Sequence, residues 1–90
     1  MDYEYRIKND EIIEISIIEG KRVETPTGVK AFYTKQEICD KYHWGKDMMR
    51  KRLEEIAPYI YNGTDEGFVT TKKVFAPFEM ERILNYYGLP

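Results

Sequence analysis

Residues 46–51 contain the basic side chains Lys46, Arg50 and Lys51, which are the ones in this chain best suited to binding an anion. In "GKDMMRKRL", Arg50 and Lys51 lie away from the apolar positions of the segment. Arginine can donate two hydrogen bonds to guanine O6 and N7, and lysine can neutralise a phosphate. The pattern therefore indicates a nucleic-acid interface on one helix face. The alternative is a solvated face on which Arg50 pairs with Glu54 one turn later.

Residue types for other chemistry are sparse. The chain has one cysteine, Cys39, and one histidine, His43, so an internal disulfide is excluded and a structural zinc site is not expected. No glycine loop of the phosphate-cradling kind and no pairing of a nucleophile with a base is evident. We therefore expect no enzyme activity, no metal and no cofactor, and we expect Cys39 to pack where two helices approach.

Composition and charge limit the class of protein. Ninety residues, 42% of them hydrophobic, favour one domain with a real core. The net charge of −2 argues against indiscriminate binding of nucleic acid, which depends on a broad positive field. Residues 1–33 hold five basic and seven acidic side chains, whereas residues 34–90 hold nine of each. Apolar runs are too short for a membrane span, and a cytoplasmic location is expected.

The first third of the chain has the alternation of β-structure. Residues 2–8 and 11–18 alternate in side-chain type, with Ile13, Ile15 and Ile17 predicted on one face, and "ND" between them suits a two-residue turn. "EGKR" predicts a second turn. "ETPTG" is too rich in turn formers for a central strand, and "VKAFY" is a candidate for one more short strand. Residues 1–33 are thus expected to form an N-terminal β-hairpin extension.

Helical spacing begins at Thr34, which has capping-box spacing to Glu37. "HWG" predicts a break, with Gly45 supplying the unusual backbone angle. A second helix is predicted from Lys46 until Pro58. Its buried stripe is expected to comprise Met49, Leu53 and Ile56. "YIYNGTDEGFVTTKKV" predicts a β-hairpin, and a last helix is expected from "APFEMERILNYYG". The predicted class is α+β: a winged helix-turn-helix over residues 34–90, with the added N-terminal hairpin.

The segment "YTKQEICDKYHWGKDMMRKRLEEI", with "FVTTKKVF" and "FEMERIL" after it, resembles the small winged-helix excisionases of phages and conjugative transposons and their MerR-like relatives. The resemblance covers residues 33 to about 85. It implies sequence-specific binding of double-stranded DNA in an excisionase-like or gene-regulating role. It places Lys46, Met48, Arg50 and Lys51 at the major groove, and Lys72 and Lys73 on phosphates. The expected DNA-contacting residues are Thr34, Lys35, Lys46, Met48, Arg50, Lys51, Lys72 and Lys73.

Several alternatives stay open at the level of sequence. Met48 borders the buried side of its helix, so a packing role competes with DNA contact. Asp65 and Glu66, at the tip of the expected wing, would repel a phosphate backbone. They favour a second hypothesis, a winged-helix module that binds a host protein, such as a small phage inhibitor of a host enzyme or defence system. A homodimer through the N-terminal hairpin and cooperative binding at adjacent DNA sites are both compatible with the sequence.

Overall fold

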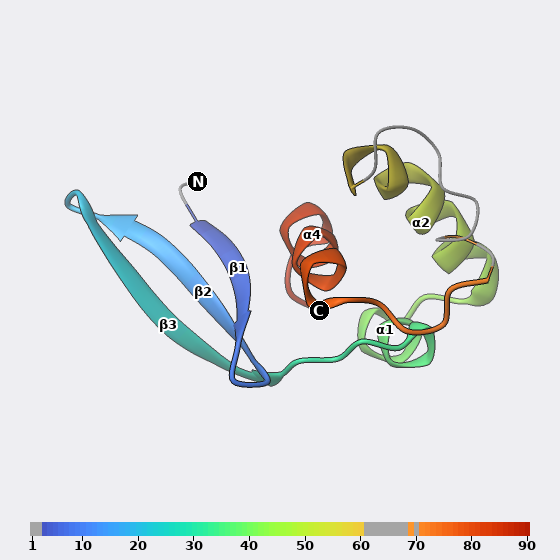
Figure 1. Ribbon diagram of the computed structural model, residues 1–90, viewed down its shortest axis with the longest axis horizontal. Helices are drawn as coiled ribbons and strands as arrows, with labels where there is room; N and C mark the ends of the chain where they lie inside the picture. The colour runs from blue at the N-terminus through green and yellow to red at the C-terminus, as the bar shows by residue number, and fades with distance from the viewer. Residues whose placement is uncertain (1–2, 61–68, 70) are drawn as a thin grey trace. The chain divides into compact units, whose positions relative to one another are not determined.

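The structure is a computed structural model that describes residues 3–60, 69 and 71–90. These residues form an α+β arrangement of a three-stranded antiparallel sheet and helices α1, α2 and α4 (Figure 1). The chain divides into two compact units, Met1–Ala31 and Phe32–Pro90. No helix in the described part of the chain is long and apolar enough to cross a membrane.

The first unit is a meander of strands β1 (Tyr3–Lys8), β2 (Glu11–Ile18) and β3 (Lys21–Lys30), in the order β1-β2-β3. The predicted turn between β1 and β2 is confirmed, because Asn9 and Asp10 both have positive φ angles, 50° and 63°. Two-residue hairpin loops of this kind need such angles at both positions, which Asn and Asp tolerate.

The third strand differs from the sequence prediction. β3 includes the whole "ETPTG" segment, whereas Ala31, Phe32 and Tyr33 lie outside any strand. The segment is not central, because β3 is an edge strand of the sheet, where a proline such as Pro26 is tolerated. The extension is therefore a three-stranded sheet rather than a hairpin alone.

The buried residues of β2 also differ from the prediction. Ile12 and Ile15 are buried, whereas Ile17 is 53% exposed. The register pairs Ile12 with Ile7 on β1, and the pairing with β3 is irregular between Glu11 and Ile13. The burial of β2 therefore does not follow a simple period of two, and the expected face of Ile13, Ile15 and Ile17 is only partly buried.

The second unit begins with two helices separated by three residues: α1 (Lys35–Tyr42) and α2 (Lys46–Ile60). The predicted capping box is confirmed, since the Thr34 hydroxyl accepts from the Glu37 amide and Glu37 Oε1 lies 3.4 Å from the Thr34 amide. The left-handed residue that ends α1 is His43, with φ 57°, rather than Gly45. Its backbone N–H donates to the Cys39 carbonyl, so the helix ends at Tyr42, where the predicted break begins.

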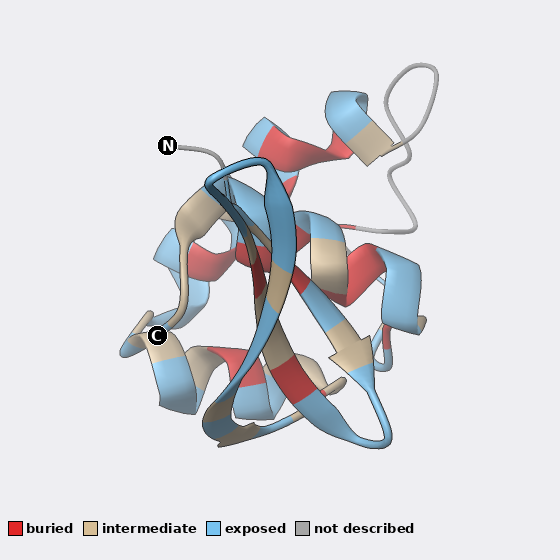
Figure 2. Ribbon diagram, turned by 90° about the vertical axis from the view of Figure 1, so that its left-hand side faces the viewer, coloured by how far each residue is buried: buried red, intermediate tan, exposed pale blue. Residues whose placement is uncertain are grey.

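Helix α2 buries Met49, Leu53 and Ile56, as the sequence predicts, together with Ala57. Figure 2 shows the buried residues of the helices and of the sheet in red. The expected end at Pro58 is wrong, because the helix continues to Ile60. Tyr59 and Ile60 are therefore helical and do not begin a β-hairpin. Residues 61–68 and 70 of that predicted hairpin lie outside the described residues, and its described residues 69 and 71–73 lie in no strand. At its far end Val74 makes only an isolated antiparallel bridge with Thr34.

Helix α4 (Pro77–Tyr87) begins with proline in its first turn and ends at Gly88, as expected. Met80, Ile83 and Leu84 are fully buried, whereas Phe78, expected in the core, is 53% exposed. Residues of α4 pack against α2 through aromatic contacts. The Tyr86 and Tyr59 ring centroids are 5.4 Å apart, at the exposed end of this contact.

Candidate nucleic-acid interface

A groove of about 830 Å³ opens in the second unit, bounded by α1, the first turns of α2 and the segment before α4. Four cationic side chains line it: Lys35, Lys46, Arg50 and Lys73. Its apolar lining comes from Cys39, Met49, Leu53, Val69 and Val74. No carboxylate is among the described residues that form this wall. The groove thus combines an apolar floor with a cationic rim.

Backbone hydrogen bonds hold the two sides of the groove together. The Lys35 amide donates to the Lys73 carbonyl over 3.0 Å, and the Phe75 amide donates to the Tyr33 carbonyl over 2.7 Å. Between these bonds lies the bridge of Thr34 with Val74. The start of α1 is therefore fastened to the segment that carries Lys73.

Lys35 is partly engaged inside the unit. Its ammonium donates to the Val69 carbonyl over 2.6 Å, and burial lowers the pKa of this ammonium. The thiol of Cys39 lies in the same groove, and burial raises its pKa, with Asp40 acting in the same direction. A thiol with a raised pKa is held as the poorly nucleophilic protonated form, which fits the packing role expected for Cys39.

The cations of α2 separate into two faces. Successive residues turn by about 100° around a helix, so residues four apart share a face. Lys46 and Arg50 face the groove, whereas Asp47 and Lys51 are exposed on the outer side and do not line it. Arg50 Nε lies 3.4 Å from Glu54 Oε1, but its side chain is 67% exposed. Such an exposed pair competes only weakly with another anion.

On the other flank of α2, Arg52 packs against aromatic side chains. The Arg52 guanidinium carbon is 5.9 Å from the Trp44 ring centroid and 5.5 Å from that of Tyr87. Trp44 in turn stacks on Tyr42 with centroids 4.5 Å apart. Trp44 therefore packs beside the turn, and the side chain of Arg52 belongs to this packing. Met48 is 43% exposed and lies outside the groove.

The structure brings together five of the eight residues predicted to contact DNA. The groove contains Thr34, Lys35, Lys46, Arg50 and Lys73. Met48 and Lys51 are exposed on α2, outside the groove. Lys72 is directed elsewhere: its ammonium lies 2.6 Å from the carboxylate of Glu79, which is fully buried. Lys72 therefore acts within the protein.

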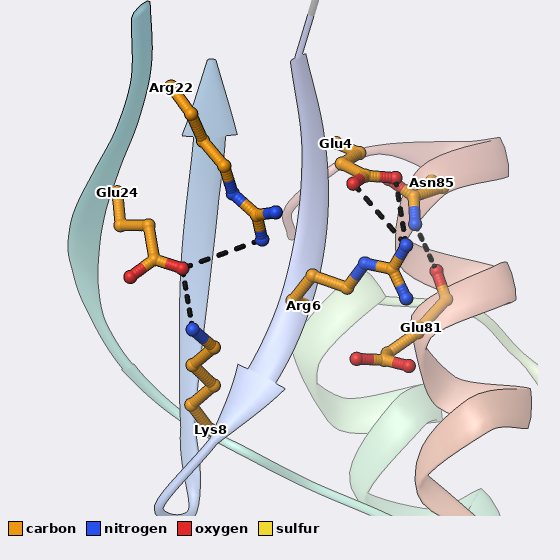
Figure 3. A network of polar contacts seen from close by, with 7 residues as sticks. All are labelled: Glu4, Arg6, Lys8, Arg22, Glu24, Glu81 and Asn85. Atoms are coloured by element: carbon orange, nitrogen blue, oxygen red, sulfur yellow. Dashed lines mark hydrogen bonds and ion pairs between the residues drawn. The ribbon is translucent and has the colours of Figure 1, made fainter.

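Three cations of the first unit, Lys8, Arg22 and Arg6, pair with carboxylates of the same sheet. The ammonium of Lys8 is 2.5 Å from Glu24, and Arg22 is 3.6 Å from the same carboxylate (Figure 3). The hydrogen bond from Lys8 lowers the pKa of Glu24. Arg6 pairs with Glu4 over 3.3 Å. These three side chains are thus already engaged with carboxylates within the sheet.

Sequence reasoning missed three features of the groove. It did not identify Val69 and Val74 as its walls, and it assigned Lys72 to a phosphate. It also did not single out Glu79, although its position three residues after Ala76 is where a glutamate reaches back to a helix start. Across residues 3–60, 69 and 71–90, no group of three or more His, Cys, Asp or Glu side chains could hold a metal ion.

Comparison with known proteins gives no relative for this arrangement: the chain matches no family model, no curated protein and no solved structure.

Proposed function

We propose that the chain binds double-stranded DNA, with α2 as the recognition helix of a winged helix-turn-helix unit and the cationic groove beside it on the phosphate backbone. The observation that carries the proposal is the collection of Lys35, Lys46, Arg50 and Lys73 around one groove whose described lining includes no carboxylate. Phosphate contacts of this kind fix a protein on the duplex without reading its sequence. The excisionase-like or gene-regulating role is the one that the sequence resemblance implies.

The faces of α2 suit insertion into the major groove. A helix with its side chains is about 10–12 Å wide, and the major groove is about 12 Å wide. With Met49 and Leu53 buried, the opposite face carries Asp47 and Lys51 toward the base edges. Arg50 lies between the buried and outer faces, where one wall of phosphates would pass. Lys51 can donate to guanine and Asp47 can accept from cytosine N4, so these two residues supply sequence preference.

The test is duplex binding by variants with matched charge changes. Arg50→Ala removes a groove cation, whereas Lys41→Ala removes an exposed cation of α1 that does not line the groove. We expect Arg50→Ala to weaken binding by about 5- to 150-fold, the range of a contact worth about 1–3 kcal/mol, and Lys41→Ala to leave it unchanged. Equal affinities of Arg50→Ala and the unmodified protein, or no duplex binding at low salt, would refute the proposal.

A second candidate function is favoured by the apolar floor of the groove. Met49, Leu53 and Val69 below a cationic rim also suit an acidic protein segment with apolar side chains, such as one of a host protein. Such a partner would be recovered from a host extract in a fixed ratio to the chain, and Met49→Ala would reduce its binding strongly. DNA binding would instead depend on Arg50 and Lys73 and would change little with Met49→Ala in a protein that stays folded.

A further inference from the structure

Glu79 is the one charged side chain that is fully buried within the described part of the chain. Its Oε1 accepts from the Ala76 amide over 2.7 Å and lies 2.6 Å from the Lys72 ammonium. The Lys72 side chain is 37% exposed, so the pair extends from the interior to the surface. The proposed DNA contacts make no use of this carboxylate.

The location of Glu79 favours a fixed carboxylate. It lies in the first turn of α4, where backbone amides and the helix dipole stabilise negative charge. A buried carboxylate nevertheless loses its hydration, and a single ion pair seldom yields a large net gain in stability. What a short buried pair does supply is a defined position for its partner. Here that partner is Lys72, in the segment that leads into α4.

Lys72 and Lys73 are consecutive, and their side chains lie in different environments. The Lys72 ammonium is held at Glu79, while Lys73 lines the groove. The backbone of this segment is fastened to the start of α1, since the Lys73 carbonyl accepts from the Lys35 amide and Val74 bridges Thr34. With the Lys72 ammonium held at Glu79, the neighbouring Lys73 side chain is the one that lines the groove.

We infer that Glu79 is a positioning residue: by holding Lys72, it fixes the backbone at residue 73 and presents the Lys73 ammonium to the phosphate backbone in the groove. The inference rests on the proposed function for its ligand, a DNA phosphate. The effect of Glu79 on the backbone at residue 73 does not depend on that function. Glu79 touches no DNA in this scheme. Its effect passes through Lys72 and the backbone bonds of residues 73 and 75.

The first measurement is amide hydrogen exchange in the DNA-free protein, followed by NMR. Glu79→Gln keeps an oxygen acceptor for the Ala76 amide but removes the charge that holds Lys72. We expect exchange at the Lys35 and Phe75 amides to accelerate by at least about tenfold, because a hydrogen bond to a charged group is lost. Exchange at Leu53 in α2 is expected to stay unchanged, and Glu81→Gln, on the same helix, serves as the matched control.

The second measurement is the salt dependence of duplex binding. Glu79→Gln and Lys73→Ala should each reduce the slope of log affinity against log salt by about 0.9, the value of one phosphate contact. Combining them should give no further reduction, because both remove the same contact. Lys72→Met should reproduce the effect of Glu79→Gln, and it provides a second variant if the glutamine substitution prevents folding.

The outcomes separate this inference from the proposed function. Unchanged exchange at Lys35 and Phe75 in both Glu79→Gln and Lys72→Met would overturn the positioning role, whatever the DNA data. Acceleration that includes Leu53 equally would also overturn it, because it would indicate a general loss of stability. Absence of duplex binding by the unmodified protein would refute the proposed function, and the exchange data would then still decide whether Glu79 fixes the segment.

Discussion

The cationic groove leads to a quantitative expectation for salt. It contains Lys46, Arg50 and Lys73, with the more engaged Lys35 as a fourth cation. If each cation neutralises one phosphate, three or four condensed counterions are released on binding. At about 0.9 per contact, the slope of log affinity against log salt is about −2.7 to −3.6. Affinity should then fall by about 40- to 150-fold between about 50 and about 200 mM salt.

Fluorescence anisotropy on a short labelled duplex measures this slope directly. The double variant Arg50→Ala/Lys73→Ala should reduce the slope by about 1.8, because two contacts are lost. Lys41→Ala removes charge outside the groove and should leave the slope as it is, because its distance from the DNA allows solvent and salt to screen it. A slope near zero for the unmodified protein, or an unchanged slope for the double variant, would refute the reasoning.

Two further predictions concern the stability of the second unit. Leu53 is 1% exposed, so Leu53→Ala should lower the free energy of unfolding by about 2–5 kcal/mol in urea titrations. Met48→Ala, at a 43% exposed position of the same helix, should change it by less than about 0.5 kcal/mol. Burial, and next Glu55, raise the pKa of Tyr87 to about 12 from the ordinary value of 10.0. In the unfolded state the Tyr87 hydroxyl therefore loses its proton at a lower pH than in the folded state. Its contribution to the free energy of unfolding is present below pH 10 and should fall as the pH rises toward about 12. Thermal melts of Tyr87→Phe should show a smaller fall than the unmodified protein, and equal falls would contradict this prediction.

Local signals in the sequence predicted the elements well where a few neighbouring residues decide the backbone. Asn9 and Asp10 tolerate the positive φ angles of a tight turn, and they adopt them. Thr34 and Glu37 complete a capping box through contacts within one turn of helix. The buried stripe of α2 likewise follows from helical spacing.

Predictions failed where distant residues decide the outcome. Tyr59 has the propensity of a strand residue, yet its ring packs near Tyr86 of α4 and it stays in α2. Lys72 looks like a phosphate ligand until the buried carboxylate of Glu79 is placed beside it. Most of the expected wing falls outside the described residues, and its described residues 69 and 71–73 lie in no strand. The groove itself depends on Val69 meeting α1, which no local pattern indicates.

The most direct test of the DNA-binding account is an NMR titration of the labelled chain with a short duplex at low salt. The account predicts that chemical-shift changes concentrate at the groove cations and at the exposed face of α2, with small changes across residues 3–30; the residues concerned are Lys35, Lys46, Asp47, Arg50, Lys51 and Lys73. Changes confined to the sheet residues, or none at saturating duplex, would contradict it.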